Sequence, residues 1–281
     1  ELAAPVEDFT TEDLIAEDDM VVTITHRGYA KRHVPALYRA QRRGGKGKVA
    51  ASTADEDFVS MVFVASTHAY LLCFTNKGRV HWLKVFELPE LSRGAKGKAL
   101  VNLLQLAEGE RIQAILPVRD FGEGGYVVLA TRDGTIKKTE LEQYSNPRRG
   151  GIIAINLRDG DSLVSAMLAD SADDILLVSR RGMSLRFAAD DTALRPMGRS
   201  TAGVKGMSFR EGDRLLSADV LKADRPEDST DAVFVVTEGG YAKRTPLSDY
   251  RVQGRGGLGI KVAALDPERG ALVGALVIDP D

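Results

Sequence analysis

A unit of about fifty residues recurs five times along this chain, and no other feature constrains the fold as strongly. Each copy has an apolar run, a glycine turn, a second run with basic residues, and a glycine-rich basic loop. The turn glycines stand 50, 56, 48 and 58 residues apart, at Gly28, Gly78, Gly134, Gly182 and Gly240. In the first, second and fifth copies the last loop glycine follows 19 residues later, at Gly47, Gly97 and Gly259.

This repeat length, with several short strands in each unit, is typical of a propeller blade. No amphipathic helical stretch interrupts the repeats, which argues against a helical solenoid. The first run of each unit is apolar almost throughout, as in 176–178 and 233–236, which predicts a strand covered on both faces by neighbouring blades. We therefore predict an all-β fold of four-stranded blades. Their approximate limits are 20–66, 67–124, 125–172, 173–230 and 231–281.

The first basic loop has a composition suited to holding phosphate. Its seven residues are Gln41, Arg42, Arg43, Gly44, Gly45, Lys46 and Gly47. Glycines can turn consecutive N–H groups toward one anion, while arginine and lysine supply the charge. No acidic residue occurs between Met20 and Ala54, although eight basic residues do. The alternative interpretations are an arginine-glycine turn in a solvated loop and the edge of a disordered RGG tract.

The other basic residues of the repeats are predicted to extend a positively charged rim. The second runs carry charge that we expect to point outward, at Lys31, Arg32, Lys137, Lys138, Arg186, Lys243 and Arg244. The loops and the residues just after them add Lys48, Arg93, Lys96, Lys98, Arg148, Arg149, Arg199, Lys205, Arg255 and Lys261. Such a rim would contact DNA phosphates without reading bases.

The formal charge of -2 hides an asymmetry along the chain. Residues 1–19 hold eight acidic residues and no Lys or Arg, so the rest carries 38 basic against 32 acidic residues. We expect 1–19 to be an acidic linker that ends in an edge strand and could compete with DNA for the rim. Because the sequence begins at Glu1, we also expect it to be a fragment of a longer protein.

The sequence lacks the usual signatures of catalysis, metal binding and membrane insertion. Its four histidines show no ligand spacing, its one cysteine lies in the apolar run 70–74, and it contains no Walker or nucleophile-elbow motif. No signal peptide or membrane-length apolar run is present. We expect an intracellular chain without catalytic residues, metal, cofactor, membrane contact or small-molecule substrate.

The heptad QRRGGKG matches the GyrA box at all seven positions, and the chain from about residue 11 to the end resembles the C-terminal domain of the DNA gyrase A protein. The resemblance implies a β-pinwheel, a propeller-like disc of blades that exchange strands and wrap double-stranded DNA. It also implies a bacterial cytoplasmic enzyme of A2B2 composition, in which this domain works with the N-terminal domain of gyrase A and with gyrase B. The breaking tyrosine, ATP and Mg would belong to other domains, and the wrapping would enable negative supercoiling.

Two departures leave alternatives open. Five repeats are visible where the gyrase family commonly has six, so either a sixth blade is missing from the sequence or the disc is shorter and open. An acidic C-terminal tail, present in some relatives, is absent. The C-terminal domain of topoisomerase IV, where five repeats are common but the box is degenerate or missing, is the nearest alternative. A propeller that serves as a protein-interaction scaffold is the alternative from another class, and a propeller enzyme comes third.

Overall fold

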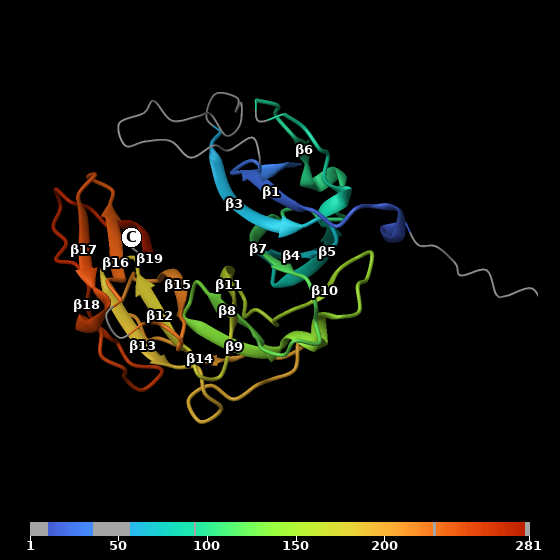
Figure 1. The fold of residues 1–281 in the computed structure, drawn as a ribbon. Helices are drawn as coiled ribbons and strands as arrows, with labels where there is room; N and C mark the ends of the chain where they lie inside the picture. The colour runs from blue at the N-terminus through green and yellow to red at the C-terminus, as the bar shows by residue number, and fades with distance from the viewer. Residues whose placement is uncertain (1–10, 36–56, 93, 227–228, 279–281) are drawn as a thin grey trace, which may run out of the picture. The chain divides into compact units, whose positions relative to one another are not determined.

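The computed structural model describes residues 11–35, 57–92, 94–226 and 229–278 (Figure 1). In this part of the chain the strands form five separate sheets. The strand pairs with an established register in these sheets are antiparallel. The predicted all-β class is therefore confirmed. Contacts group the chain into two compact units, one of 1–72, 81–107 and 117–120, the other of 73–80, 108–116 and 121–281.

The first unit contains the sheet of the first repeat, in the order β3-β1-β2-β6. Its strands are β1 (Asp19–Thr25), β2 (Tyr29–His33), β3 (Val59–Ser66) and β6 (Lys98–Ala99). The predicted edge strand at the end of 1–19 is wrong. The described part of that segment holds one 3-10 turn, η1 (Glu12–Leu14), and β1, which begins at Asp19, lies between β3 and β2. The reason is burial, because every β1 residue after Asp19 is buried.

The second sheet has the order β10-β5-β4-β7. Its strands are β4 (Tyr70–Thr75), β5 (Arg79–Lys84), β7 (Ile112–Val118) and β10 (Ile152–Ile153). Its connections include short 3-10 turns, η3 (Val85–Glu87) and η4 (Leu100–Asn102).

The other three sheets belong to the second unit. The third has the order β11-β8-β9-β14, built from β8 (Tyr126–Thr131), β9 (Thr135–Glu140), β11 (Leu163–Ala169) and β14 (Val204–Lys205). The fourth has the order β15-β12-β13-β18, built from β12 (Asp174–Ser179), β13 (Met183–Ala188), β15 (Leu215–Leu221) and β18 (Ile260–Lys261). The fifth has three strands in the order β17-β16-β19, namely β16 (Ala232–Thr237), β17 (Ala242–Pro246) and β19 (Leu272–Ile278). Two further 3-10 turns are η5 (Leu141–Tyr144) and η6 (Leu247–Asp249).

Each four-stranded sheet takes its short outer strand from the following repeat. In this way β6 pairs with β2, β10 with β5, β14 with β9, and β18 with β13. Strand exchange, which the family resemblance implied, is therefore present. Each short strand lies within a basic loop or at its C-terminal end, so the exchange fixes this part of every described loop on the preceding repeat.

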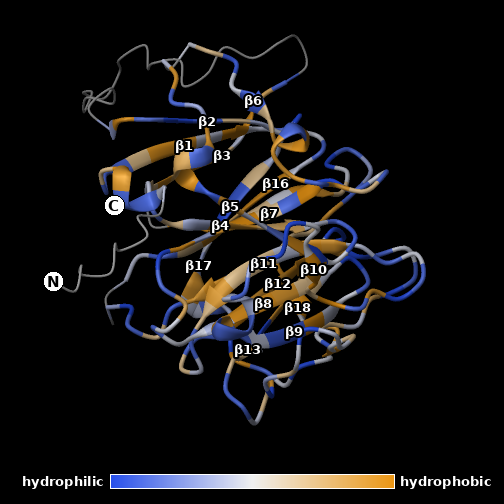
Figure 2. Ribbon diagram, turned by 90° about the vertical axis from the view of Figure 1, so that its right-hand side faces the viewer, coloured by the Kyte–Doolittle hydropathy of each residue, from blue (hydrophilic) through white to orange (hydrophobic). Residues whose placement is uncertain are grey.

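The core of the second unit explains the continuous apolar runs. Ile175 and Leu177 of β12 pack in one cluster with Val128 and Ala130 of β8. Leu176 and Val178 pack in another cluster with strand β16. Successive residues of a strand point to opposite faces, so β12 is covered on both sides as predicted. In Figure 2 the apolar colour is concentrated in the strands of this region and the polar colour in the connecting loops.

The hairpin turns confirm the predicted role of the turn glycines. All five have positive φ, between 73° and 84°. A serine or threonine three positions before the glycine, which the repeat pattern did not predict, completes each turn. Its side chain accepts a hydrogen bond from the N–H that follows the glycine, at 3.1 to 3.3 Å, in the pairs Tyr29/Thr25, Arg79/Thr75, Thr135/Thr131, Met183/Ser179 and Tyr241/Thr237.

Candidate nucleic-acid interface

Four basic loops lie at least partly in the described part of the chain. We define them as loop 2 (92–98), loop 3 (148–151), loop 4 (198–206) and loop 5 (254–259). The QRRGGKG heptad at 41–47 lies outside the described residues, as do Lys48 and Arg93 of the predicted rim. The described loops are therefore the observable candidates for an interface.

Several predicted rim residues are exposed. They are Lys96, Lys98, Arg148, Arg149, Lys205, Lys243, Arg244 and Lys261. Strand exchange presents three of them, because Lys98, Lys205 and Lys261 belong to the short strands β6, β14 and β18. The ammonium group of Lys96 lies 4.2 Å from the centroid of the Tyr29 ring. These side chains can reach an external anion.

The prediction that the second-strand lysines point outward is wrong for Lys31, Lys137 and Lys138. Their exposed fractions are 1%, 0% and 0%. The following repeat covers them, because its loop and its short strand lie along the second strand. A buried ammonium group that is already bonded to protein oxygens cannot also contact DNA, so we remove these three residues from the predicted rim.

Lys137 is bonded to backbone carbonyls. Its Nζ donates to Ala154 O at 2.6 Å, to Thr201 O at 3.4 Å and to Arg199 O. Burial, with a smaller contribution from the charge of Arg199, lowers the pKa of Lys137 to about 7. Lys31 repeats the arrangement in the first unit, where its Nζ donates to Ser92 O at 3.1 Å and to Ala95 O at 2.8 Å. Burial lowers the pKa of Lys31 as well.

In the first, third and fourth repeats the basic residue one position further along the second strand is also bonded to protein partners. Lys138 Nζ donates to Ala189 O at 2.6 Å and to Asp191 Oδ1 at 2.8 Å. Arg32 donates to Leu88 O and pairs with Glu90, and Arg186 donates to Tyr250 O and pairs with Asp174. Arg32 and Arg186 are half-buried and hold the segment that leads into the next loop, so a DNA-contact role for them has no geometric support here.

Loops 3 and 5 are held by other donors of the preceding repeat. The Arg79 guanidinium donates to Gly150 O at 2.8 Å and to Gly151 O at 3.2 Å. Ser208 donates from Oγ to Gly256 O at 2.8 Å and from its N–H to Gly257 O at 2.9 Å. The sequence patterns did not predict these roles for Arg79 and Ser208. The position of Arg79 directly after a turn glycine was the available signal for the first of them.

Arg199 and Arg255 are half-buried, and Arg255 is tied to the protein. Its Nε donates to Ala193 O at 2.8 Å, and its Nη1 donates to Lys205 O. Arg255 therefore links loop 5 to loop 4, and we assign it a structural contribution that the sequence did not predict.

One glycine in each of loops 2, 4 and 5 lies directly on the preceding repeat. A Cβ atom on Gly97, Gly203 or Gly259 would stand 2.7, 2.6 or 2.0 Å from the carbonyl oxygen of Ala30, Ile136 or Ser184. All three glycines have positive φ. Contact with the residue two positions after the previous turn glycine explains why these three positions must be glycine.

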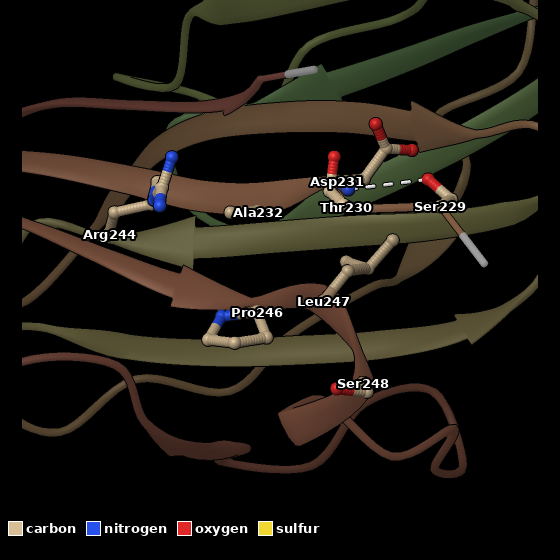
Figure 3. Close-up of a pocket in the computed structure, with 8 residues that line it drawn as sticks. All are labelled: Ser229, Thr230, Asp231, Ala232, Arg244, Pro246, Leu247 and Ser248. Atoms are coloured by element: carbon tan, nitrogen blue, oxygen red, sulfur yellow. Dashed lines mark hydrogen bonds between the residues drawn. The ribbon is translucent and has the colours of Figure 1, made fainter. Parts of the chain in front are cut away.

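A pocket lies beside the outer strand of the fifth sheet. The eight residues that line it are labelled in Figure 3: Ser229, Thr230, Asp231, Ala232, Arg244, Pro246, Leu247 and Ser248. Asp231 donates its N–H to Ser229 Oγ at 3.3 Å and pairs with Arg225 at 2.9 Å. The carboxylate is thus committed, and Arg244 is the cation that this pocket presents.

Within the described residues, no group of three or more His, Cys, Asp or Glu side chains could hold a metal ion. Cys73 is buried, and burial raises the pKa of its thiol to about 12. No helix in this part of the chain is long and apolar enough to cross a membrane.

A family comparison matches all five repeats. The family described as "DNA gyrase C-terminal domain, beta-propeller" matches residues 19–66, 69–119, 125–170, 173–222 and 231–279. The DNA gyrase A protein of Streptomyces coelicolor is 53% identical over 277 residues, which are 97% of this chain and 32% of that protein. The corresponding gyrase A protein of Mycobacterium tuberculosis H37Rv is 50% identical over 274 residues, 98% of this chain and 32% of that protein. This chain spans about a third of the length of these relatives.

Two solved structures have a similar fold. The C-terminal domain of DNA topoisomerase IV matches with a TM-score of 0.76 and 29% identity, covering 94% of this chain and 79% of that one. A DNA gyrase A C-terminal domain matches with a TM-score of 0.72 and 27% identity, covering 94% of this chain and 84% of that one.

Proposed function

This chain belongs to the family of DNA gyrase C-terminal domains, and on that premise we propose that it binds double-stranded DNA without regard to sequence and wraps it chirally along its basic loops. The observation that carries the proposal is the recurrence of an exposed lysine in the exchanged strands, at Lys98, Lys205 and Lys261. A repeated phosphate contact of this kind binds the DNA backbone and is independent of base sequence.

Wrapping requires contacts distributed along the DNA path. Bending a few tens of base pairs by 40 to 90° costs about 1 to 6 kcal/mol, so one loop cannot hold a larger wrap. Each neutralised phosphate releases counterions, and the affinity should therefore fall steeply as salt increases. The QRRGGKG heptad, with three basic residues among seven, is the proposed anchor of the wrap.

In the longer gyrase A protein we propose a supporting, non-catalytic role for this chain. The N-terminal part of gyrase A together with gyrase B, in an A2B2 assembly, would supply DNA cleavage and ATP hydrolysis with Mg. The wrap would present a distant segment of the same DNA to them and so permit negative supercoiling. Family membership favours a bacterial cytoplasmic location and the absence of a cofactor in this chain.

A topoisomerase IV type of domain, which binds and bends DNA without chiral wrapping, is the second candidate. The similarity to the topoisomerase IV domain structure supports it. The intact heptad and the sequence identity to gyrase A proteins favour the gyrase type. The two candidates differ in the linking number that they impose on DNA.

The decisive test is ligation of nicked circular DNA with this chain bound, followed by separation of topoisomers after the protein is removed. We expect a shift in linking number that grows with protein concentration and is lost at high salt. Binding without a shift would favour the topoisomerase IV type. Absence of binding at low salt would refute both candidates.

A further inference from the structure

Each described basic loop turns some of its backbone carbonyls toward a donor of the preceding repeat. Loop 2 is held by Lys31, loop 3 by Arg79, loop 4 by Lys137 and loop 5 by Ser208. The position three residues after the turn glycine is lysine in the first and third repeats and leucine in the fourth, where Ser208 takes over. Different side chains thus reach the same kind of oxygen, which points to a shared requirement.

We propose that Lys137 is a positioning residue for DNA binding, which fixes loop 4 so that its phosphate-binding groups face outward, and that Lys31 does the same for loop 2. The proposal rests on the proposed function of the loops. It assigns the two lysines no contact with DNA, since both are buried.

The geometry of the peptide bond gives the mechanism. In a trans peptide the C=O of one residue and the N–H of the next point in opposite directions. Because the carbonyl of Arg199 faces Lys137, the N–H of Ser200 points away from the buried ammonium. The carbonyl of Ala95 faces Lys31, so the N–H of Lys96 likewise points away. Ser200 and Lys96 are exposed. The loops thereby direct backbone donors outward beside their basic side chains, an arrangement that favours anions.

The surroundings of Lys137 leave the carbonyls as its partners. The pKa of Lys137 is lowered by burial and by the positive charge of Arg199, and both causes disfavour the charged form of the side chain. Its Nζ donates to the carbonyls of Ala154, Arg199 and Thr201. Removal of Nζ would leave these oxygens without that donor, which favours a rearranged loop.

The test compares the 281-residue chain with its Lys137→Met variant, using a random-sequence DNA duplex at several salt concentrations. We expect the variant to bind DNA about tenfold more weakly at about 0.1 M salt. The slope of log affinity against log salt concentration should fall in magnitude by about two, one for each basic residue of loop 4. The double variant Arg199→Ala/Lys205→Ala removes the same two basic side chains directly. Added to this double variant, Lys137→Met should change DNA affinity less than about twofold, because the basic side chains that it positions are already absent.

Amide hydrogen exchange without DNA supplies a second readout. Lys137→Met should accelerate exchange within 198–206 and leave 148–151 unchanged. Equal losses of affinity in both backgrounds, or unchanged exchange in loop 4, would overturn the proposal. If the native chain failed to bind DNA, the proposed function would fail, while the exchange data would still decide whether Lys137 holds the loop. If Lys137→Met does not fold, Lys31→Met with exchange in 92–98 tests the same claim.

Discussion

The buried ammonium of Lys137 makes the stability of the fold depend on pH. Burial lowers its pKa from 10.5 to about 7, so the unfolded chain binds more protons between these values. Stability should therefore rise with pH across this window. Between about pH 7 and about pH 9.5, the free energy of unfolding of the native chain should increase by about 3 kcal/mol relative to that of the Lys137→Met variant. Denaturant titrations of both proteins measure the difference, and a constant difference would contradict the assignment.

Asp219 of β15 produces a pH dependence of opposite sign. Burial raises its pKa to about 6, against a partial lowering by Arg225. The folded chain then binds more protons than the unfolded chain between pH 3.8 and about 6, so stability falls as pH rises through this range. Asp219→Asn should gain about 2 kcal/mol relative to the native chain from about pH 4 to about pH 6.5. Asp224→Asn, an exposed carboxylate nearby, is the control and should show no such gain.

At the level of elements, the close contact of the loop glycines holds the exchanged strands. Gly203 has a φ of +84°, and a Cβ there would stand 2.6 Å from Ile136 O, whereas Gly198 in the same loop has open space around its Cβ position. Gly203→Ala should therefore cost about 2 to 4 kcal/mol, and Gly198→Ala should change stability by less than about 1 kcal/mol. Thermal unfolding compares the two variants. A similar cost for both would show that the contact is not what fixes the strand β14.

The elements themselves were largely predictable because their signals are local. Gly134 marks a turn through its own backbone conformation, and the run around Leu176 and Leu177 reports coverage on both faces through hydropathy alone. The interval of 19 residues ends, in the second and fifth repeats, at a glycine that contacts the hairpin of the preceding repeat. In the fourth repeat Gly203 makes this contact 21 residues after Gly182, and no spacing rule predicts that.

The candidate site was less predictable because it depends on strand exchange. In sequence, Lys137 and Lys138 have the same pattern as exposed basic residues such as Lys243 and Arg244. Whether such a residue is covered depends on a loop about sixty residues later, as with Lys137 and Arg199. On β17 the described residues supply no following strand, and Lys243 and Arg244 are exposed. Burial here is a property of the next repeat, so composition cannot report it.

At the level of the whole molecule, acidic and basic residues are paired near the start of the chain. Glu12 pairs with Lys84 at 3.0 Å, and Glu17 pairs with Arg119 at 2.5 Å. In the described part of the acidic segment these two carboxylates thus have partners within the first unit. Competition between the segment and DNA stays a prediction for residues 1–10, whose deletion should raise DNA affinity at low salt if it occurs.

The basic loops should divide the tasks of binding and wrapping between them. Arg148 and Arg149 are exposed in loop 3, so Arg148→Ala/Arg149→Ala should lower the salt slope of binding by about two and weaken the linking-number shift in proportion to occupancy.

Arg42→Ala/Arg43→Ala/Lys46→Ala removes the charge of the proposed anchor. At protein concentrations adjusted to equal occupancy, this variant should lose most of the linking-number shift, because a wrap needs its path fixed at the anchor.

The control for both variants is Arg158→Ala/Arg214→Ala, which removes two exposed arginine side chains outside the basic loops. It carries the same change in net charge as the loop 3 variant. This control should leave the salt slope of DNA binding within about 0.5 of the native value, since a basic side chain that contacts no phosphate releases no counterion. If all three variants shifted the slope and the linking number alike, net charge alone would govern the interaction. The loops would then have no separate role in directing the DNA.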